Sequence, residues 1–88
     1  MKTSVENIQQ AIGQCFNLEP DKLHTHVIAY DFYALFTAMY SDLKPYECQK
    51  LLGVNSNSLC KFKARAIKRI ENDGMLPVAE KIRSILTN

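Results

Sequence analysis

The sequence predicts an all-α fold, a compact bundle of five or six helices that contains a helix-turn-helix. Three observations lead to this prediction. Apolar residues recur at helical spacing in several segments, and no stretch alternates between apolar and polar residues as a half-buried strand would. Glycines and prolines fall between those segments, where helices start and stop. The stretch "LLGVNSNSLCKFKARAIKRI", residues 51–70, places a basic helical pattern directly behind a glycine.

A first helix is predicted from a capping box and from its apolar spacing. Thr3 and Glu6 stand at the separation that such a box requires. Its inward face is expected to carry Val5, Ile8, Ile12, Cys15 and Phe16. The segment "NLEPDKL" ends this helix, with Pro20 suited to the start of a short helix and Leu23 returning to the core.

A second main helix is expected to begin at Asp31, because the preceding "HTHVIAY" reads as an irregular loop. Its inward residues would be Phe32, Leu35, Phe36 and Met39. Ser41 and Asp42 end it. Pro45, at a first-turn position, then opens a short helix that runs through Leu52.

Gly53 is expected to form the corner of a helix-turn-helix that spans about residues 44–72. Leu52, Val54 and Leu59 would pack this corner, and Asn55 or Ser56 would cap the next helix. That helix should run from about Ser56 to Asn72, before Gly74. A last helix is predicted from Pro77, with its inward residues at Val78, Ile82, Ile85 and Leu86.

The helix behind the corner carries an apolar stripe and a basic stripe. At about 100° per residue, Leu59, Phe62, Ala66 and Ile70 gather on one side, and Asn57, Ser58, Lys61, Arg65 and Lys68 on another. A helix that enters the major groove of DNA needs such a layout, although a basic stripe is also typical of an ordinary solvated face. The predicted base-contacting residues are Ser56, Asn57 and Lys61. The predicted phosphate-contacting residues are Lys44, Lys50, Ser58, Arg65, Lys68 and Arg69.

From "VENIQQAIGQCFNLEPDKL" to "KIRSILTN", the chain resembles the C-terminal DNA-binding domain of the bacterial replication initiator DnaA. The resemblance implies an all-α, Trp-repressor-like helix-turn-helix that binds double-stranded DNA and has a role in replication or transcription control. Two motifs depart from the family. Asn55, Ser56, Asn57 and Ser58 stand where the family has Asp-His-Thr-Thr, and "HTHVIAYD" replaces its arginine-rich loop. The resemblance therefore implies an altered sequence preference.

Other classes of function find no support in the sequence. No nucleophile is placed with a base, so we expect no enzyme, and no glycine-rich phosphate loop or other cofactor motif is present. His24 and His26 lack a third ligand, and Cys15, Cys48 and Cys60 lack metal-site spacing, so we expect no metal. The absence of a membrane-length apolar run and of a secretory signal predicts a cytoplasmic, nucleoid-associated protein with no membrane partner.

The charge distribution leaves two interpretations open. Five of the eleven Lys and Arg lie between Lys61 and Arg69, although the formal net charge is only +2. A monomer of this kind should bind DNA weakly, so tight recognition would need a second copy of the chain or a larger replication or regulatory protein. The alternative is a protein-interaction module that kept the scaffold and lost DNA binding. It would expose an apolar patch on the region from Tyr30 to Tyr40 or on the last helix.

Overall fold

The computed structural model describes residues 3–87, and its regular elements there are all helices. The order along the chain is α1 (Val5–Phe16), the 3₁₀ helix η1 (Pro20–Thr25), α2 (Val27–Tyr40), α3 (Pro45–Leu52), α4 (Ser56–Asn72) and α5 (Leu76–Thr87). The predicted all-α class is confirmed.

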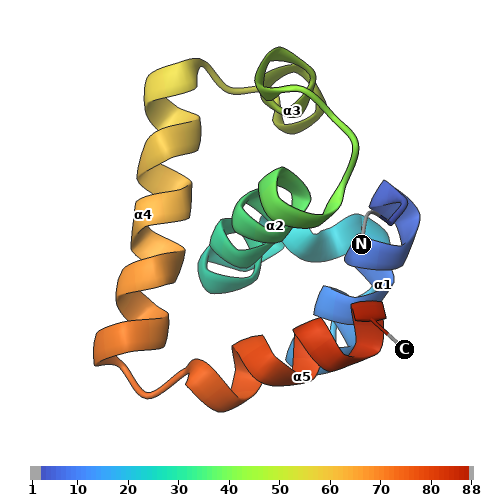
Figure 1. Ribbon diagram of the computed structural model, residues 1–88, viewed down its shortest axis with the longest axis vertical. Helices are drawn as coiled ribbons and strands as arrows, with labels where there is room; N and C mark the ends of the chain where they lie inside the picture. The colour runs from blue at the N-terminus through green and yellow to red at the C-terminus, as the bar shows by residue number, and fades with distance from the viewer. Residues whose placement is uncertain (1–2, 88) are drawn as a thin grey trace.

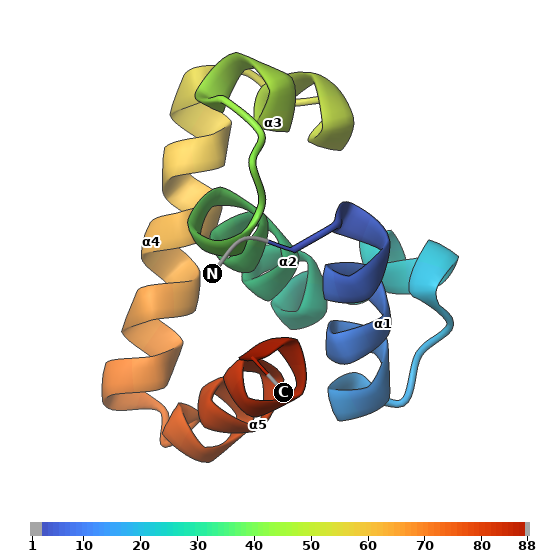
Figure 2. The same cartoon turned by 45° about the vertical axis from the view of Figure 1, so that its right-hand side comes forward.

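Helix α2 lies in the middle of the molecule. It packs against α1, η1, α3 and α4, while α5 closes the bundle against α1 and α4 (Figures 1 and 2). Residues 31–37 of α2 are all buried, with Phe32 and Phe36 on one side of the helix and Ala34 on the opposite side. A helix that is apolar nearly all round belongs in the centre of a fold, which explains the apolar run "FYALF".

The first helix begins one residue later than its capping pattern predicts. The backbone N–H of Thr3 donates to the carbonyl of Tyr40 at 2.6 Å, which ties Thr3 to the end of α2. Ser4 is the cap instead, since its Oγ accepts from the backbone N–H of Asn7 at 3.2 Å. The rest of the prediction agrees with the structure, because Ile8 and Ile12 are fully buried.

The predicted start of the second main helix at Asp31 is wrong. Helix α2 starts at Val27, and the Nδ1 atom of His26 accepts the backbone N–H of Ala29 at 3.3 Å. His26 is therefore the N-cap of this helix, the role expected of Asp31 from the sequence. Asp31 lies inside the helix and is completely buried. Met39, predicted to point inward, is half-exposed.

The later elements follow the predicted bounds closely. Helices α3 and α4 begin and end where the sequence places them, and Gly74 adopts a positive φ of 71° after α4. Helix α5 starts at Leu76, so Pro77 is its second residue. Ile82 and Leu86 of α5 are buried, as expected.

Candidate nucleic-acid interface

The corner between α3 and α4 is built around Gly53. This glycine adopts a left-handed φ of 69°, and the next N–H, of Val54, donates to the carbonyl of Gln49 at 3.0 Å. Leu52 and Leu59 are buried on either side of the turn. The hydroxyl of Tyr30 on α2 donates to the Leu52 carbonyl at 2.7 Å, which fixes the end of α3 to the central helix. The corner therefore holds α4 at a set angle to the bundle.

Helix α4 lies at the edge of the molecule, and its axis crosses that of α3, which is seen nearly end-on in Figure 1. The helix begins at a well-formed cap, because Asn55 Oδ1 accepts the backbone N–H of Ser58 at 2.8 Å. Leu59 and Ala66 face inward and are buried, while Phe62 and Ile70 pack partly against the core. The apolar stripe predicted from the sequence is thus the stripe that contacts the bundle.

The outward face of α4 carries the three predicted base-contacting residues. Ser56, Asn57 and Lys61 are all exposed, and so is Lys68 farther along the same helix. Small side chains, Cys60 and Ala64, lie exposed between them. None of the ion pairs formed among residues 3–87 involves Lys61 or Lys68. The first turns of α4 therefore offer polar and cationic groups with little bulk to block a close approach.

The other predicted phosphate-contacting residues differ in how exposed they are. Lys44 and Lys50 of the α3 segment are exposed, and the backbone N–H of Lys44 donates to Glu47 Oε1 at 2.9 Å to cap α3. Ser58 is half-buried, and its backbone N–H is occupied by the Asn55 cap. The structure thus places the lysines on open surface and Ser58 closer to the body of the fold.

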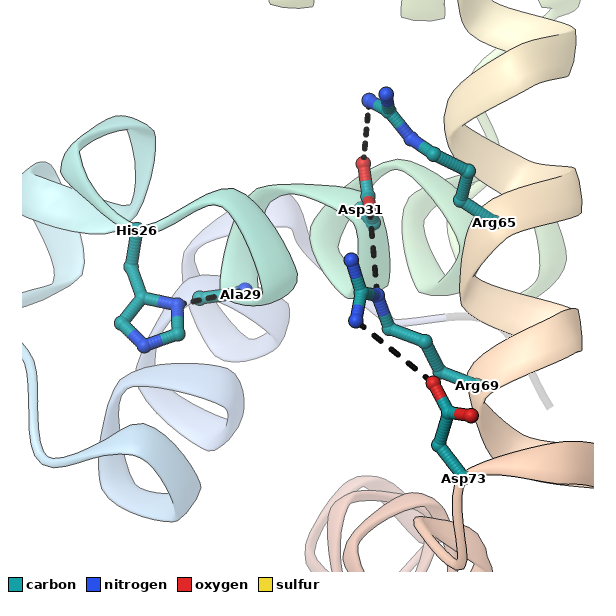
Figure 3. A network of polar contacts seen from close by, with 6 residues as sticks. All are labelled: His26, Ala29, Asp31, Arg65, Arg69 and Asp73. Atoms are coloured by element: carbon teal, nitrogen blue, oxygen red, sulfur yellow. Dashed lines mark hydrogen bonds and ion pairs between the residues drawn. The ribbon is translucent and has the colours of Figure 1, made fainter.

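Arg65 and Arg69 point from α4 toward a carboxylate in α2 (Figure 3). Arg65 Nη2 donates to Asp31 Oδ1 at 3.1 Å, and Arg69 Nε lies 3.9 Å from Asp31 Oδ2. Arg69 also lies 3.9 Å from Asp73, one turn further along. The side chain of Arg65 remains 49% exposed, against 29% for Arg69 and 1% for Asp31. The two arginines therefore join α4 to α2, and about half of Arg65 still faces solvent.

The buried carboxylate of Asp31 is electrostatically costly. Burial raises its pKa above the ordinary value, against the opposing hydrogen bond and charge of Arg65 and the charge of Arg69. Its Oδ2 atom is buried without a hydrogen-bond donor, as is the Nε donor of Arg69 without an acceptor. The network therefore stabilises the ionised carboxylate incompletely, with Arg65 as its one close partner.

Sequence reasoning missed this network, because the partners are 34 residues apart. The one signal in the sequence is a single acidic residue, Asp31, inside the apolar run "VIAYDFYALF". A charged residue within a buried helix must find a partner. Its position alone could have indicated a buried ion pair, but could not have indicated which cations complete it.

The two histidines do not form a site together. His24 is exposed on η1, whereas His26 caps α2 and lies against the ring of Phe16 at a centroid distance of 5.5 Å. Between residues 3 and 87, no group of three or more His, Cys, Asp or Glu side chains is arranged to hold a metal ion. In the same part of the chain, no helix is long and apolar enough to cross a membrane.

The exposed large apolar side chains are spread over several helices, and they include Met39 in the region from Tyr30 to Tyr40 and Leu76 on the last helix, the two places expected for a protein-interaction module. Most of the aromatic residues of α2 are buried, so the region from Tyr30 to Tyr40 is mainly core, with Met39 half-exposed. Tyr46 and Leu51 of α3 are instead 65% and 43% exposed. Together with Leu43 and Val5 they line a shallow groove of about 550 Å³ between α1 and α3.

Comparison of the chain with known proteins found no matching family model, no matching curated protein and no matching solved structure.

Proposed function

We propose that this chain is a non-enzymatic domain that binds double-stranded DNA by inserting α4 into the major groove. The single observation that carries this proposal is the exposed first half of α4 behind the Gly53 corner. Asn57 and Lys61 stand there on open surface, while the opposite side of the helix is locked into the core. A helix held rigidly at one edge of a small bundle has the geometry that groove-binding helices need.

In this proposal, some side chains of α4 contact bases and others contact phosphates. Ser56, Asn57 and Lys61 lie nearest the base edges, where an asparagine can read adenine through two hydrogen bonds. Lys68 and Arg65 lie farther along the helix and would contact phosphates, with Lys44 and Lys50 of α3 on the neighbouring backbone. Ser58 and Arg69 are more enclosed, so their phosphate contacts would be secondary.

The resemblance to the DNA-binding domain of DnaA supports a role in replication or transcription control with an altered sequence preference. Asn55 to Ser58 replace the family's base-reading signature, and Asn55 is occupied as a helix cap. The segment that replaces the family's arginine-rich loop is helical from Val27 onward and contains neither lysine nor arginine. With fewer cations, a single copy would bind weakly, so tight binding in the nucleoid would need a second copy or a larger protein.

The direct test is a double charge reversal on the outward face of α4. Lys61→Glu with Lys68→Glu should lower the affinity for mixed-sequence duplex at about 50 mM salt by at least tenfold, because two cations on the DNA-facing side of α4 become anions that the phosphate backbone repels. Lys81→Glu with Arg83→Glu on α5 is the matched control, since both residues are exposed and the change in net charge is the same. Equal losses from both pairs would show that net charge, not the α4 surface, determines binding.

Selection of bound duplexes from a random pool tests the sequence preference. We expect enriched positions that lose their enrichment when Asn57 is replaced by alanine, because a base-contacting side chain affects some sequences more than others. A pool that is bound without enrichment would reduce the proposal to non-specific binding.

A protein-interaction module is the second candidate, and the groove between α1 and α3 is the observation that favours it. Tyr46 and Leu51 expose apolar surface beside Glu6 and Lys50, away from the core contacts of α4. If wild-type protein fails to bind duplex at about 50 mM salt, while Tyr46→Ser abolishes capture of a defined protein partner, this candidate replaces the first.

A further inference from the structure

Burying the carboxylate of Asp31 inside α2 costs free energy, and the presence of this residue therefore requires an explanation. The carboxylate is completely buried, and one of its oxygens has no hydrogen-bond donor. Buried ion pairs can often be replaced by apolar residues of similar volume without loss of stability. Apart from Asp31 itself and Thr37, the buried side chains of α2 are apolar or aromatic, so an apolar side chain at this position would suit the core. Asp31 is therefore better explained by what it does to its partners than by stability.

Its principal partner is Arg65, which is held from two sides. The hydrogen bond from Arg65 Nη2 to Asp31 Oδ1 fixes one end of the guanidinium, and the ring of Phe62 lies 5.0 Å from its central carbon. These contacts still leave 49% of the side chain exposed. A guanidinium has five N–H donors, so most of them remain to bind another acceptor.

The exposed half of Arg65 borders the outward face of α4. Arg65 follows Lys61 by four residues and precedes Lys68 by three, so the three cations are neighbours along the helix surface. Lys61 and Lys68 are flexible point charges, whereas a planar guanidinium can make two parallel hydrogen bonds to a phosphate. A prearranged arginine at this position would fix the register of α4 on the backbone.

We infer that Asp31 is a positioning residue for DNA binding: from inside α2 it holds the Arg65 guanidinium, stacked on Phe62, in the orientation that receives a DNA phosphate. This inference rests on the proposed function. Ordering Arg65 in advance removes part of the entropy that a free arginine would lose on binding. Asp31 also brings a negative charge near the phosphate, but it lies behind the guanidinium and is buried away from the surface.

The experiment separates positioning from charge. Asp31→Leu removes both the acceptor and the charge, and Asp31→Asn removes the charge but keeps an acceptor. Asp73→Asn is the matched control, because it changes the net charge equally beside Arg69 without touching Arg65. Each substitution is also made in an Arg65→Gln background. Duplex affinity is measured at about 50 and 150 mM salt, at a temperature where circular dichroism shows every variant to be folded.

The inference predicts that Asp31→Leu lowers affinity about three- to tenfold, that Asp31→Asn has a smaller effect, and that Asp73→Asn does not lower affinity. In the Arg65→Gln background, Asp31→Leu should not lower duplex affinity any further. Without DNA, the side-chain ¹⁵N resonances of Arg65 should show hindered rotation of the guanidinium in the wild type and faster rotation in Asp31→Leu.

Three results would overturn the inference but not the proposed function. A gain in affinity from Asp31→Leu, or a change equal to that from Asp73→Asn, would mean that the carboxylate competes with phosphate or acts only through net charge. A loss that persists in the Arg65→Gln background would mean a purely structural role. In each of these three cases, wild-type binding shows that the proposed function still stands. Absence of wild-type binding would overturn the proposed function and this inference together.

Discussion

Asn55, the N-cap of α4, and Asn57, inside the helix, look alike in the sequence but have different surroundings in the fold. The side chain of Asn55 caps the helix through the backbone N–H of Ser58, whereas Asn57, one half-turn later, is exposed. An amide that is already hydrogen-bonded to its own backbone is restrained, while an exposed one can reach a base edge. The difference between structural and recognition roles is therefore decided at single positions.

This difference gives a prediction for the pair. Asn55→Ala should destabilise the protein by about 1 kcal/mol, because it removes an N-cap. Asn57→Ala should change stability by less than about 0.5 kcal/mol but should weaken duplex binding. Denaturant unfolding and a duplex titration of both variants check this. The assignment of Asn57 to recognition would be contradicted if Asn57→Ala were destabilised as much as Asn55→Ala and bound duplex with unchanged affinity.

Also at the residue scale, the buried Asp31 makes the stability of the protein depend on pH. Burial raises the pKa of Asp31 in the folded state above its ordinary value, so the folded state holds this proton more tightly than the unfolded state. The contribution of Asp31 to stability is therefore greatest below that value and falls as the pH rises through the folded pKa. In Asp31→Asn the side chain does not ionise, so this loss of stability with rising pH does not occur.

We therefore expect the melting temperature of Asp31→Asn, relative to the wild type, to increase as the pH is raised from about 3 to about 7. Thermal unfolding of both proteins across that range measures it. Asp73→Asn serves as the control, since Asp73 is largely exposed. A relative melting temperature that falls with pH would mean that the two arginines outweigh burial.

At the scale of whole elements, helix ends depend on contacts that a local pattern does not contain. Helices α3 and α4 match their predicted bounds because their signals, Pro45, Gly53 and Asn55, act within a few residues. Helix α1 starts at Val5 because Thr3 is bonded to Tyr40. Helix α2 extends to Val27 because a histidine supplies its cap, and histidine is not among the residues usually preferred there.

Helix α1 provides a prediction at this scale. Glycine inside a helix is usually destabilising, so replacing it by alanine should stabilise a protein by roughly 0.5–1 kcal/mol. A Cβ at Gly13 would lie 2.6 Å from the carbonyl oxygen of Leu18, which folds back over the end of the helix.

Gly13→Ala should therefore destabilise the protein by about 1–3 kcal/mol, since backbone must move to admit the methyl group. Gly74→Ala is the comparison: its added Cβ meets nothing within 4 Å, and only its positive φ is strained. Chemical denaturation would measure both. A Gly13→Ala variant more stable than the wild type would show that the α1–η1 turn relaxes freely.

At the scale of the whole molecule, three thiols lie at three depths. Cys48 is buried, Cys15 is half-buried and Cys60 is exposed on the outward face of α4. Burial raises the pKa of both the Cys15 and the Cys48 thiols, although Lys81 opposes this at Cys15 and Lys63 opposes it at Cys48. Because the thiolate is the reactive form, the native fold should protect these two.

Alkylation at near-neutral pH should therefore modify Cys60 first, and saturating duplex DNA should slow that modification several-fold if α4 is the binding surface. Mass spectrometry of the labelled peptides measures all three sites in one sample. Cys15 and Cys48 report whether DNA changes the fold as a whole. Unchanged Cys60 labelling at saturating DNA would exclude the outward face of α4 as the interface.

The candidate site could be predicted from the sequence only in part. Ser56, Asn57, Lys61 and Lys68 were expected on an open face, and the structure exposes all four. Their exposure follows from helical periodicity, which any amphipathic helix obeys. Arg65 and Arg69 belong to the same periodic pattern, but the structure pairs both with Asp31. Periodicity indicates on which side of its helix a residue lies, but it does not indicate which neighbouring helix that side contacts.

The sequence by itself determined the helical class, the corner at Gly53 and the two faces of α4, because each depends on residues within a few positions of one another. Only the tertiary structure decided that Asp31 is buried, that it holds Arg65 and that Tyr46 and Leu51 are exposed. These depend on the packing of α2 against α4 and of α3 against its neighbours. Contacts between distant segments follow from the shape of the whole core, which no local pattern encodes.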